Sequence, residues 1–314
     1  MIKLDLKHWV LVGPGAVGLY YGGRIAKFAR LGVLARSGAE VLETDGIRIK
    51  MLDPSTGKTL QVLHAPLEYV AVKAESIAPP DYVIIATKST VNEELIKPLR
   101  SIIKPGHTTI LCLQNGMGNA EFFSKYFPRN PILLGLCFVC VNRVEPAVVE
   151  NYHTGRVEIG SLGDLWPKHA QAVVQVFNDS GVSTKYAEVL DAALWRKLCW
   201  NVPFNGLCIT QGGITTDKII GNAPLARRAR VLMEEVREAA AIEGHVIPDT
   251  FLDAQFSLTE KMRAYKPSSL IDYLAGKPVE LESIWGKPLR RGQALGAEMP
   301  ELTKLYDQLK ALLD

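Results

Sequence analysis

A glycine-rich loop near the N-terminus limits the fold more than any other feature of this sequence. Gly13, Gly15 and Gly18 follow a short apolar run at residues 9–12 and open a helix-like segment at residues 16–28. The first glycine permits a tight turn, the second lets the backbone approach a pyrophosphate, and the third lets the helix pack closely on the strand. The N–H groups and dipole at the start of that helix favour phosphate. The loop therefore predicts a dinucleotide site formed by Gly13, Gly15, Ala16, Val17 and Gly18.

Strand-like and helix-like segments alternate after this loop, which is typical of a parallel sheet with crossover helices. Buried strands are predicted at residues 9–12, 33–35, 82–87 and 108–113, helices at 16–28 and 91–99, a hairpin at 46–52 and 60–64, and further strands at 131–144 and 155–160. From about Leu190 long helical patterns replace the strands, and residues 227–244 form an amphipathic helix with Leu232, Met233, Val236 and Ala240 inside. The predicted fold class is α/β: a Rossmann-type dinucleotide-binding domain at 1–189 and an all-helical domain at 190–314 that carries the substrate site.

Composition excludes several classes of protein. The 314 residues are 47% hydrophobic with a formal net charge of +3, which argues against disorder and against nucleic acid or a membrane surface as a partner. The N-terminus lacks a signal-peptide pattern, and no run reaches eighteen apolar residues, so a cytoplasmic location is expected.

The five cysteines lie in apolar runs and are predicted to be buried, reduced thiols, with Cys137 and Cys140 on opposite faces of a strand. No metal site is predicted.

The end of the second strand indicates which dinucleotide is bound. An acidic residue there would accept a hydrogen bond from the ribose 2′-hydroxyl of NAD, but this strand ends in Arg36 and Ser37. An arginine pairs with a 2′-phosphate, so NADP(H) is predicted as the cofactor. The alternative is that Arg36 is an ordinary surface residue.

A stripe of polar residues crosses an otherwise apolar helix in the C-terminal half. Lys197, Asn201 and Asn205 are four residues apart, so they spread over about 80° of one face. Such groups destabilise the fold by several kcal/mol unless they find partners. A substrate site would explain the stripe, because a lysine with donor-rich neighbours can polarise a carbonyl and supply a proton. A structural polar network between the domains is the alternative. Pro203 lies within the stripe and is expected to bend the helix and splay the two asparagines.

Two further groups of polar residues have simpler interpretations. Ser269 and Asp272 have the spacing of a capping box for a short helix that ends at Gly276, which leaves Ser268 and Glu280 without a structural role. The basic cluster at residues 227–230 is expected to form the solvated face of its helix.

Taken in order along the chain, these motifs resemble those of the ketopantoate reductases (2-dehydropantoate 2-reductases). The resemblance rests on Gly13-x-Gly15-Ala-Val-Gly18, Leu34-Ala35-Arg36, Ala86-Thr87-Lys88, Gln114-Asn115-Gly116, Lys197-x3-Asn201-x3-Asn205 and Ser268-x3-Asp272-x7-Glu280. It extends over nearly the whole chain. It implies a Rossmann domain, a helical domain, an active site in the cleft between them, a homodimer, and NADPH-dependent reduction of a small 2-keto acid in pantothenate biosynthesis.

The resemblance also implies roles for individual residues. Lys197 matches the catalytic proton donor, and Glu280 the acid that works with it. The remaining matches are Asn201, Asn205 and Ser268 for the substrate, Asn115 for nicotinamide and substrate, and Lys88 for the cofactor. The chain departs from the family pattern at Trp285, Glu282 and Gly206, and a bulky Trp285 near the cleft would change which 2-keto acid fits.

Two alternatives to this function stay open. One is reduction of another 2-keto acid or of an imine, and the other is a non-catalytic nucleotide sensor on the same fold. A sensor needs the glycine loop and Arg36 but has no use for Lys197 together with Glu280.

Overall fold

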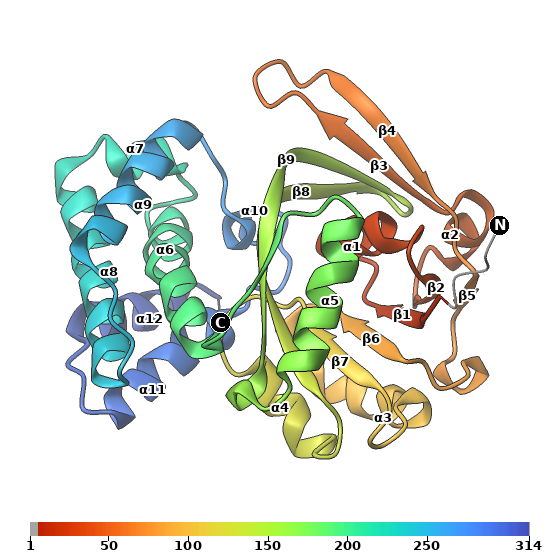
Figure 1. The fold of residues 1–314 in the computed structure, drawn as a ribbon. Coiled ribbons are helices and arrows are strands. Elements are labelled where there is room, and N and C mark those ends of the chain that lie inside the picture. The colour runs from red at the N-terminus through yellow and green to blue at the C-terminus, as the bar shows by residue number, and fades with distance from the viewer. Residues whose placement is uncertain (1–5, 314) are drawn as a thin grey trace. The chain divides into compact units, whose positions relative to one another are not determined.

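The computed structural model describes residues 6–313 and divides the chain into two compact units (Figure 1). Unit 1 contains the chain up to Gln114 and the segment Asn119–Leu190. Unit 2 contains the rest of the chain from Asp191, together with the four-residue segment Asn115–Gly118. This short segment therefore belongs to a different unit from its neighbours in sequence.

Unit 1 is built on one mixed sheet. Within the described residues its ten strands are β1 (His8–Val12), β2 (Arg30–Leu34), β3 (Ile47–Leu52), β4 (Thr59–Ala65), β5 (Tyr69–Ala71), β6 (Tyr82–Ile85), β7 (Thr109–Cys112), β8 (Ile132–Glu145), β9 (Val148–Ser161) and β10 (Thr184–Tyr186). Their order is β4-β3-β9-β8-β7-β6-β1-β2-β5, and β10 pairs with β9. The predicted central strands are confirmed, because β6 pairs in parallel with both β1 and β7. The predicted hairpin is confirmed as the antiparallel pair β3 and β4.

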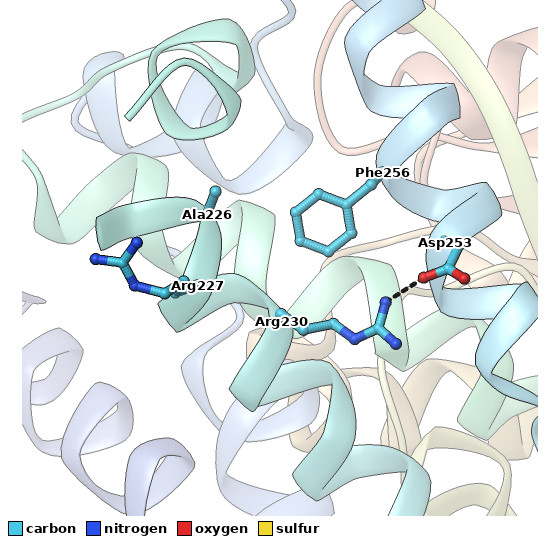
Figure 2. A pocket seen from close by; sticks show the side chains of 5 residues that line it. All are labelled: Ala226, Arg227, Arg230, Asp253 and Phe256. Atoms are coloured by element: carbon cyan, nitrogen blue, oxygen red, sulfur yellow. Dashed lines mark hydrogen bonds and ion pairs between the residues drawn. The ribbon is translucent and has the colours of Figure 1, made fainter. Parts of the chain in front are cut away.

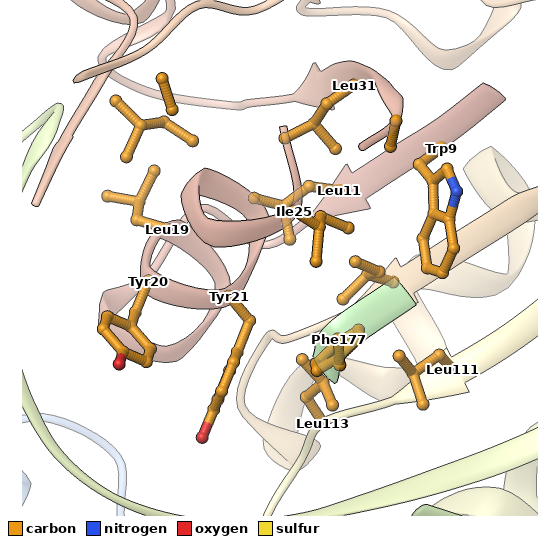
Figure 3. Packing of buried hydrophobic residues seen from close by; sticks show 14 of the residues in the cluster. Trp9, Leu11, Leu19, Tyr20, Tyr21, Ile25, Leu31, Leu111, Leu113 and Phe177 are labelled. Carbon is orange, nitrogen blue, oxygen red and sulfur yellow. The ribbon is translucent and has the colours of Figure 1, made fainter. Parts of the chain in front are cut away.

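Five α-helices lie within the described part of unit 1 up to Asp179. They are α1 (Ala16–Ile25), α2 (Ala39–Asp45), α3 (Asn92–Ile102), α4 (Asn119–Tyr126) and α5 (Pro167–Asp179). The long strands β8 and β9 pair antiparallel along most of their length, and α1 contacts both of them as well as β3. Figure 3 shows the resulting core, in which Leu19, Tyr21 and Ile25 of α1 lie among residues of the sheet and Phe177 of α5. Helix α1, which follows the glycine loop, therefore packs against several strands of the sheet and against α5.

Among its described residues unit 2 contains helices joined by loops and no strand. Its helices are α6 (Leu190–Thr210, which begins at the last residue of unit 1), α7 (Thr216–Ile220), α8 (Ala223–Ile242), α9 (Asp249–Met262), α10 (Ser268–Leu274), α11 (Lys287–Ala294) and α12 (Pro300–Leu313), with a π-helical turn at Glu282–Gly286. The amphipathic helix predicted at 227–244 is α8, and its predicted inner face is buried. It begins four residues earlier than predicted because the Asn222 side chain accepts a hydrogen bond from the Leu225 N–H and caps it.

The arginines of α8 do not form a uniformly solvated face. Arg227 is exposed, but Arg228 donates to Glu301 at 2.9 Å and Arg230 lies between Glu234 at 2.8 Å and Asp253 at 2.5 Å. The prediction of a solvated face is therefore wrong for Arg228 and Arg230, because acidic residues from neighbouring helices pair with them.

The predicted capping box is also wrong. Helix α10 begins at Ser268, and its N-cap residue is Pro267 rather than Ser269; Pro267 makes no side-chain capping bond. The N–H of Ser269 donates instead to Asn205 Oδ1 at 3.1 Å. The acceptor for this N–H group is therefore Asn205 of α6 and not the Asp272 side chain that the capping box predicts.

The cysteines are free thiols, but only three of the five are buried. Burial raises the pKa of Cys112, Cys199 and Cys208, the last two to about 12, so these thiols are poor nucleophiles. Cys137 and Cys140, on β8, are half-buried rather than buried.

Across residues 6–313 the structure contains no helix long and apolar enough to span a membrane. The same residues include no cluster of three His, Cys, Asp or Glu side chains arranged for a metal ion.

Candidate active site

The glycine loop of unit 1 has the close packing that its sequence predicts. Gly13 has a positive φ of 91°, and a Cβ on it would lie 2.6 Å from the backbone N of Thr87. A Cβ on Gly18 would lie 2.3 Å from the carbonyl oxygen of Gly13. Both positions exclude any side chain, so the loop fits tightly between the end of β6 and the first turn of α1.

Gly15 differs from the other two glycines because it has open space beside it. A Cβ on Gly15 would meet, among the described residues, only the Ala86 carbonyl oxygen at 4.0 Å. Gly15 is also the N-cap of α1, and neither a capping side chain nor an acidic residue occupies the first turn. The N–H groups at this helix start are therefore available to an anion, so the loop fits a dinucleotide pyrophosphate.

Arg36 lies just beyond β2, where the sequence predicts the reader of a 2′-phosphate. Its side chain is 75% exposed and pairs with Glu94 of α3 at 3.0 Å. Because the pair is exposed, it is weak, and a phosphate with two negative charges can compete with the carboxylate. Lys88 is half-buried in the segment that follows β6.

A buried amide network that the sequence analysis missed lies beyond β6 and β7. Gln114 Nε2 donates to Asn92 Oδ1 at 2.7 Å and to Thr87 Oγ1 at 3.2 Å, and Asn92 Nδ2 donates to Asn119 Oδ1 at 3.2 Å. Among the described residues Gln114 Oε1 has no partner. The network fixes Thr87 against the glycine loop. The sequence signals that could have indicated it are the motifs Ala86-Thr87-Lys88 and Gln114-Asn115-Gly116, which contain two of its members.

In unit 2 the polar stripe lies on α6, with Lys197 half-buried and both asparagines buried. Asn201 Nδ2 donates to Asn115 Oδ1 at 3.0 Å, across 86 positions of sequence. Asn205 Nδ2 donates to the Asn201 carbonyl oxygen at 3.1 Å. Helix α6 continues through Pro203, and this hydrogen bond ties the Asn205 side chain to the backbone of Asn201; the splaying of the two asparagine side chains stays a prediction.

The segment Asn115–Gly118 packs against the π-helical turn of unit 2. Gly116 has a φ of 81°, and a Cβ on it would lie 2.3 Å from the Ser283 carbonyl oxygen, which accepts from the Met117 N–H at 2.7 Å. Ser283 Oγ in turn donates to the carbonyl oxygen of Glu280 at 3.4 Å, and Glu280 is 7% exposed. One chain of contacts thus connects Asn201, Asn115 and the backbone of Glu280.

The predicted substrate residues Asn205 and Ser268 have different environments. Asn205 is 1% exposed, and its Oδ1 accepts from Ser269, the second residue of α10. Ser268 is the exposed first residue of the same helix. Asn205 therefore holds the start of α10, and through it the position of Ser268.

Two departures from the family pattern contact each other. Trp285 is 0% exposed, and its Nε1 donates to the Val202 carbonyl oxygen at 2.9 Å. A Cβ on Gly206 would lie 2.9 Å from that same Nε1. The glycine thus leaves room for the tryptophan, which fills the core of unit 2 and offers no exposed surface to a substrate. The third departure, Glu282, is exposed and pairs with Arg290 and Tyr306.

A surface cavity of about 360 Å³ lies elsewhere in unit 2, between α8 and α9 (Figure 2). Its lining residues are Ala226, Arg227, Arg230, Asp253 and Phe256. Arg230 already pairs with Asp253, and the cavity includes none of the predicted site residues. It has no group suited to carbonyl reduction.

Comparison with known proteins identifies the family of this chain. The family described as "Ketopantoate reductase PanE/ApbA" matches residues 9–164, and its "C terminal" family matches residues 189–313. A 2-dehydropantoate 2-reductase from Nostoc sp. is 31% identical, over 98% of this chain and 96% of its own. Two solved structures titled 2-dehydropantoate 2-reductase are also similar. The one from Methylococcus capsulatus has 28% sequence identity and a TM-score of 0.88, and the match covers 97% of this chain and 96% of that chain. The one from Geobacter metallireducens has 30% sequence identity and a TM-score of 0.86, and the match covers 96% of this chain and 99% of that chain.

Proposed function

The chain belongs to the ketopantoate reductase family, and from this we propose that it reduces a 2-keto acid with NADPH, converting 2-dehydropantoate to (R)-pantoate. The observation that carries the proposal is the polar stripe on α6. Lys197 shares a helix face with Asn201, which is hydrogen-bonded to Asn115, and the glycine loop of unit 1 fits a dinucleotide. A sensor of nucleotides has no need of the stripe.

The residues of unit 1 bind and orient the cofactor in this proposal. NADPH, when bound, supplies a hydride from C4 of its nicotinamide. The N–H groups after Gly15 bind the pyrophosphate, Arg36 binds the 2′-phosphate, and Lys88 adds positive charge near the cofactor. The network of Gln114 and Asn92 keeps the end of β6 rigid, which holds the loop in place.

The residues of unit 2 bind the keto acid and deliver a proton. Lys197 polarises the ketone oxygen and donates its ammonium proton to that oxygen as the alkoxide forms, which leaves a neutral amine and a hydroxyl group. Glu280 works with Lys197 as the second acid of the site, and the amine regains its proton from solvent after the product leaves. Asn201 and Asn115 orient the substrate, while Ser268, held in place by Asn205, binds its carboxylate.

The test measures NADPH oxidation against a panel of 2-keto acids for wild type, Lys197→Ala, Lys197→Arg and the exposed-surface control Lys310→Ala. We expect Lys197→Ala to reduce turnover by about 10²–10⁴-fold while NADPH binding stays nearly intact. Lys197→Arg should restore little, because a guanidinium does not release its proton. Turnover should fall on the alkaline side as the amine loses its proton. Wild-type turnover in Lys197→Ala would refute this mechanism.

The panel also tests which substrate is used, since another 2-keto acid or an imine would give the higher kcat/KM if the main proposal were wrong. A wild-type protein that binds NADPH but turns over none of these substrates would favour the sensor. The cytoplasmic location and the homodimer stay predictions, and light scattering of the purified protein tests the dimer.

A further inference from the structure

The tip of the β8–β9 hairpin packs against the glycine loop and against the turn after β2. Pro146 lies at this tip, and a Cβ on Gly38 would be 2.9 Å from Pro146 Cβ. Gly38 also has a positive φ of 71°, so only a glycine fits the turn without strain. The tip of the β8–β9 hairpin, about a hundred positions away in sequence, therefore borders the turn after β2 that carries Arg36.

Arg143 is the charged residue of β8 that reaches this place. Its Nη1 donates to the Pro14 carbonyl oxygen, within the glycine loop, at 3.0 Å, and its Nε donates to the Glu145 carbonyl oxygen at 3.3 Å. Its Nη2 is 3.5 Å from the position that a Cβ on Gly38 would take. The guanidinium group thus lies between the glycine loop, which is expected to bind the pyrophosphate, and the turn at Gly38, where the substituent on the ribose 2′ carbon is expected to lie.

The charge of Arg143 has no acidic partner among the residues that the structure describes. Both of its hydrogen-bond acceptors are neutral carbonyl groups, and the nearby Glu145 carboxylate faces Arg48 at 3.7 Å instead. Partial burial lowers the pKa of Arg143, and no nearby carboxylate offsets this effect. The side chain is nonetheless exposed to solvent, and its two bonds leave three of the five guanidinium N–H donors for a ligand.

We propose that Arg143 is a second arginine of the NADPH 2′-phosphate site and acts with Arg36. Arg36 pairs with Glu94 and is largely exposed, whereas Arg143 is held in position by the loop itself. Two guanidinium groups suit a phosphate with up to two negative charges and three acceptor oxygens. The inference rests on the proposed NADPH site and adds a specificity-determining residue to it.

The test compares cofactor binding to Arg143→Met and to Arg129→Met. Arg129 is exposed in the turn before β8, so its replacement removes the same charge from unit 1 and serves as the control. NADPH and NADH binding are titrated by fluorescence, and 2′,5′-ADP and 5′-AMP binding by calorimetry, without any substrate. We expect Arg143→Met to weaken NADPH and 2′,5′-ADP binding by roughly 10- to 100-fold and NADH and 5′-AMP binding by less than about threefold.

Each outcome decides the inference. Equal losses for NADPH and NADH, or no loss at all, would overturn it. If Arg143→Met does not fold, Arg143→Lys replaces it, because a lysine keeps the charge but not the forked geometry and should lose part of the NADPH preference. Failure of wild type to bind NADPH would instead refute the proposed function, so the two failures are distinguishable.

Discussion

The contact between Gly206 and Trp285 predicts that an alanine at position 206 destabilises unit 2. Gly206 lies within α6, where replacing glycine by alanine normally stabilises a protein by about 0.5–1 kcal/mol. Here the added methyl group would lie 2.7 Å from Leu305 Cδ2 and 2.9 Å from Trp285 Nε1, both closer than van der Waals contact. Leu305 and Trp285 are both fully buried, and the indole is held by its hydrogen bond to Val202.

The clash should outweigh the gain in helix propensity. Overfilling a packed core costs about 1–3 kcal/mol, so Gly206→Ala should lower the free energy of unfolding by roughly 0.5–2 kcal/mol. In a Trp285→Phe background the indole nitrogen is absent and Leu305 gains room to move. Gly206→Ala should then be neutral or stabilising, which gives a coupling free energy of about 1–2 kcal/mol between the two positions.

The assay is urea unfolding of wild type, both single variants and the double variant, followed by circular dichroism. A Gly206→Ala protein that is more stable than wild type would show that α6 has room at this position. Effects of the two substitutions that simply add would show that Trp285 is not the reason for the glycine.

Three further predictions concern cofactor binding and stability. Arg36→Ala should weaken NADPH binding by about 1.5–3 kcal/mol and NADH binding far less, and equal losses in a fluorescence titration would contradict its role. Asn205→Leu leaves the buried Ser269 N–H without an acceptor, so urea unfolding should show a loss of about 1–3 kcal/mol. The Glu235 carboxyl group accepts hydrogen bonds from two backbone N–H groups of α12, and burial raises its pKa. Because the protonated form is favoured in the folded state, the contribution of Glu235 to stability is present below pH 4.5 and is lost as pH rises through its folded pKa. Glu235→Gln should therefore gain in melting temperature relative to wild type between pH 4 and pH 7, and a constant difference would contradict this assignment.

The sequence alone determined the elements whose causes are local. The glycine spacing at residues 13–18 predicts a strand, a tight turn and a helix, and the structure has β1, the loop and α1 there. Apolar runs predict the central parallel strands, and the four-residue spacing from Lys197 to Asn205 places these side chains on one face of α6. Each of these features depends on residues within about one helical turn or one strand, so a short window of sequence is enough.

The tertiary structure alone decided how distant segments meet. It places Asn115 against Asn201, replaces a local cap of α10 by Asn205, buries Trp285 beside Gly206, and brings Arg143 to the glycine loop. None of these contacts has a periodic signal, because each depends on packing between residues that lie 64 to 129 positions apart in the sequence. The spacing of residues fixes which side chains share a face, but only the packed chain fixes what that face meets.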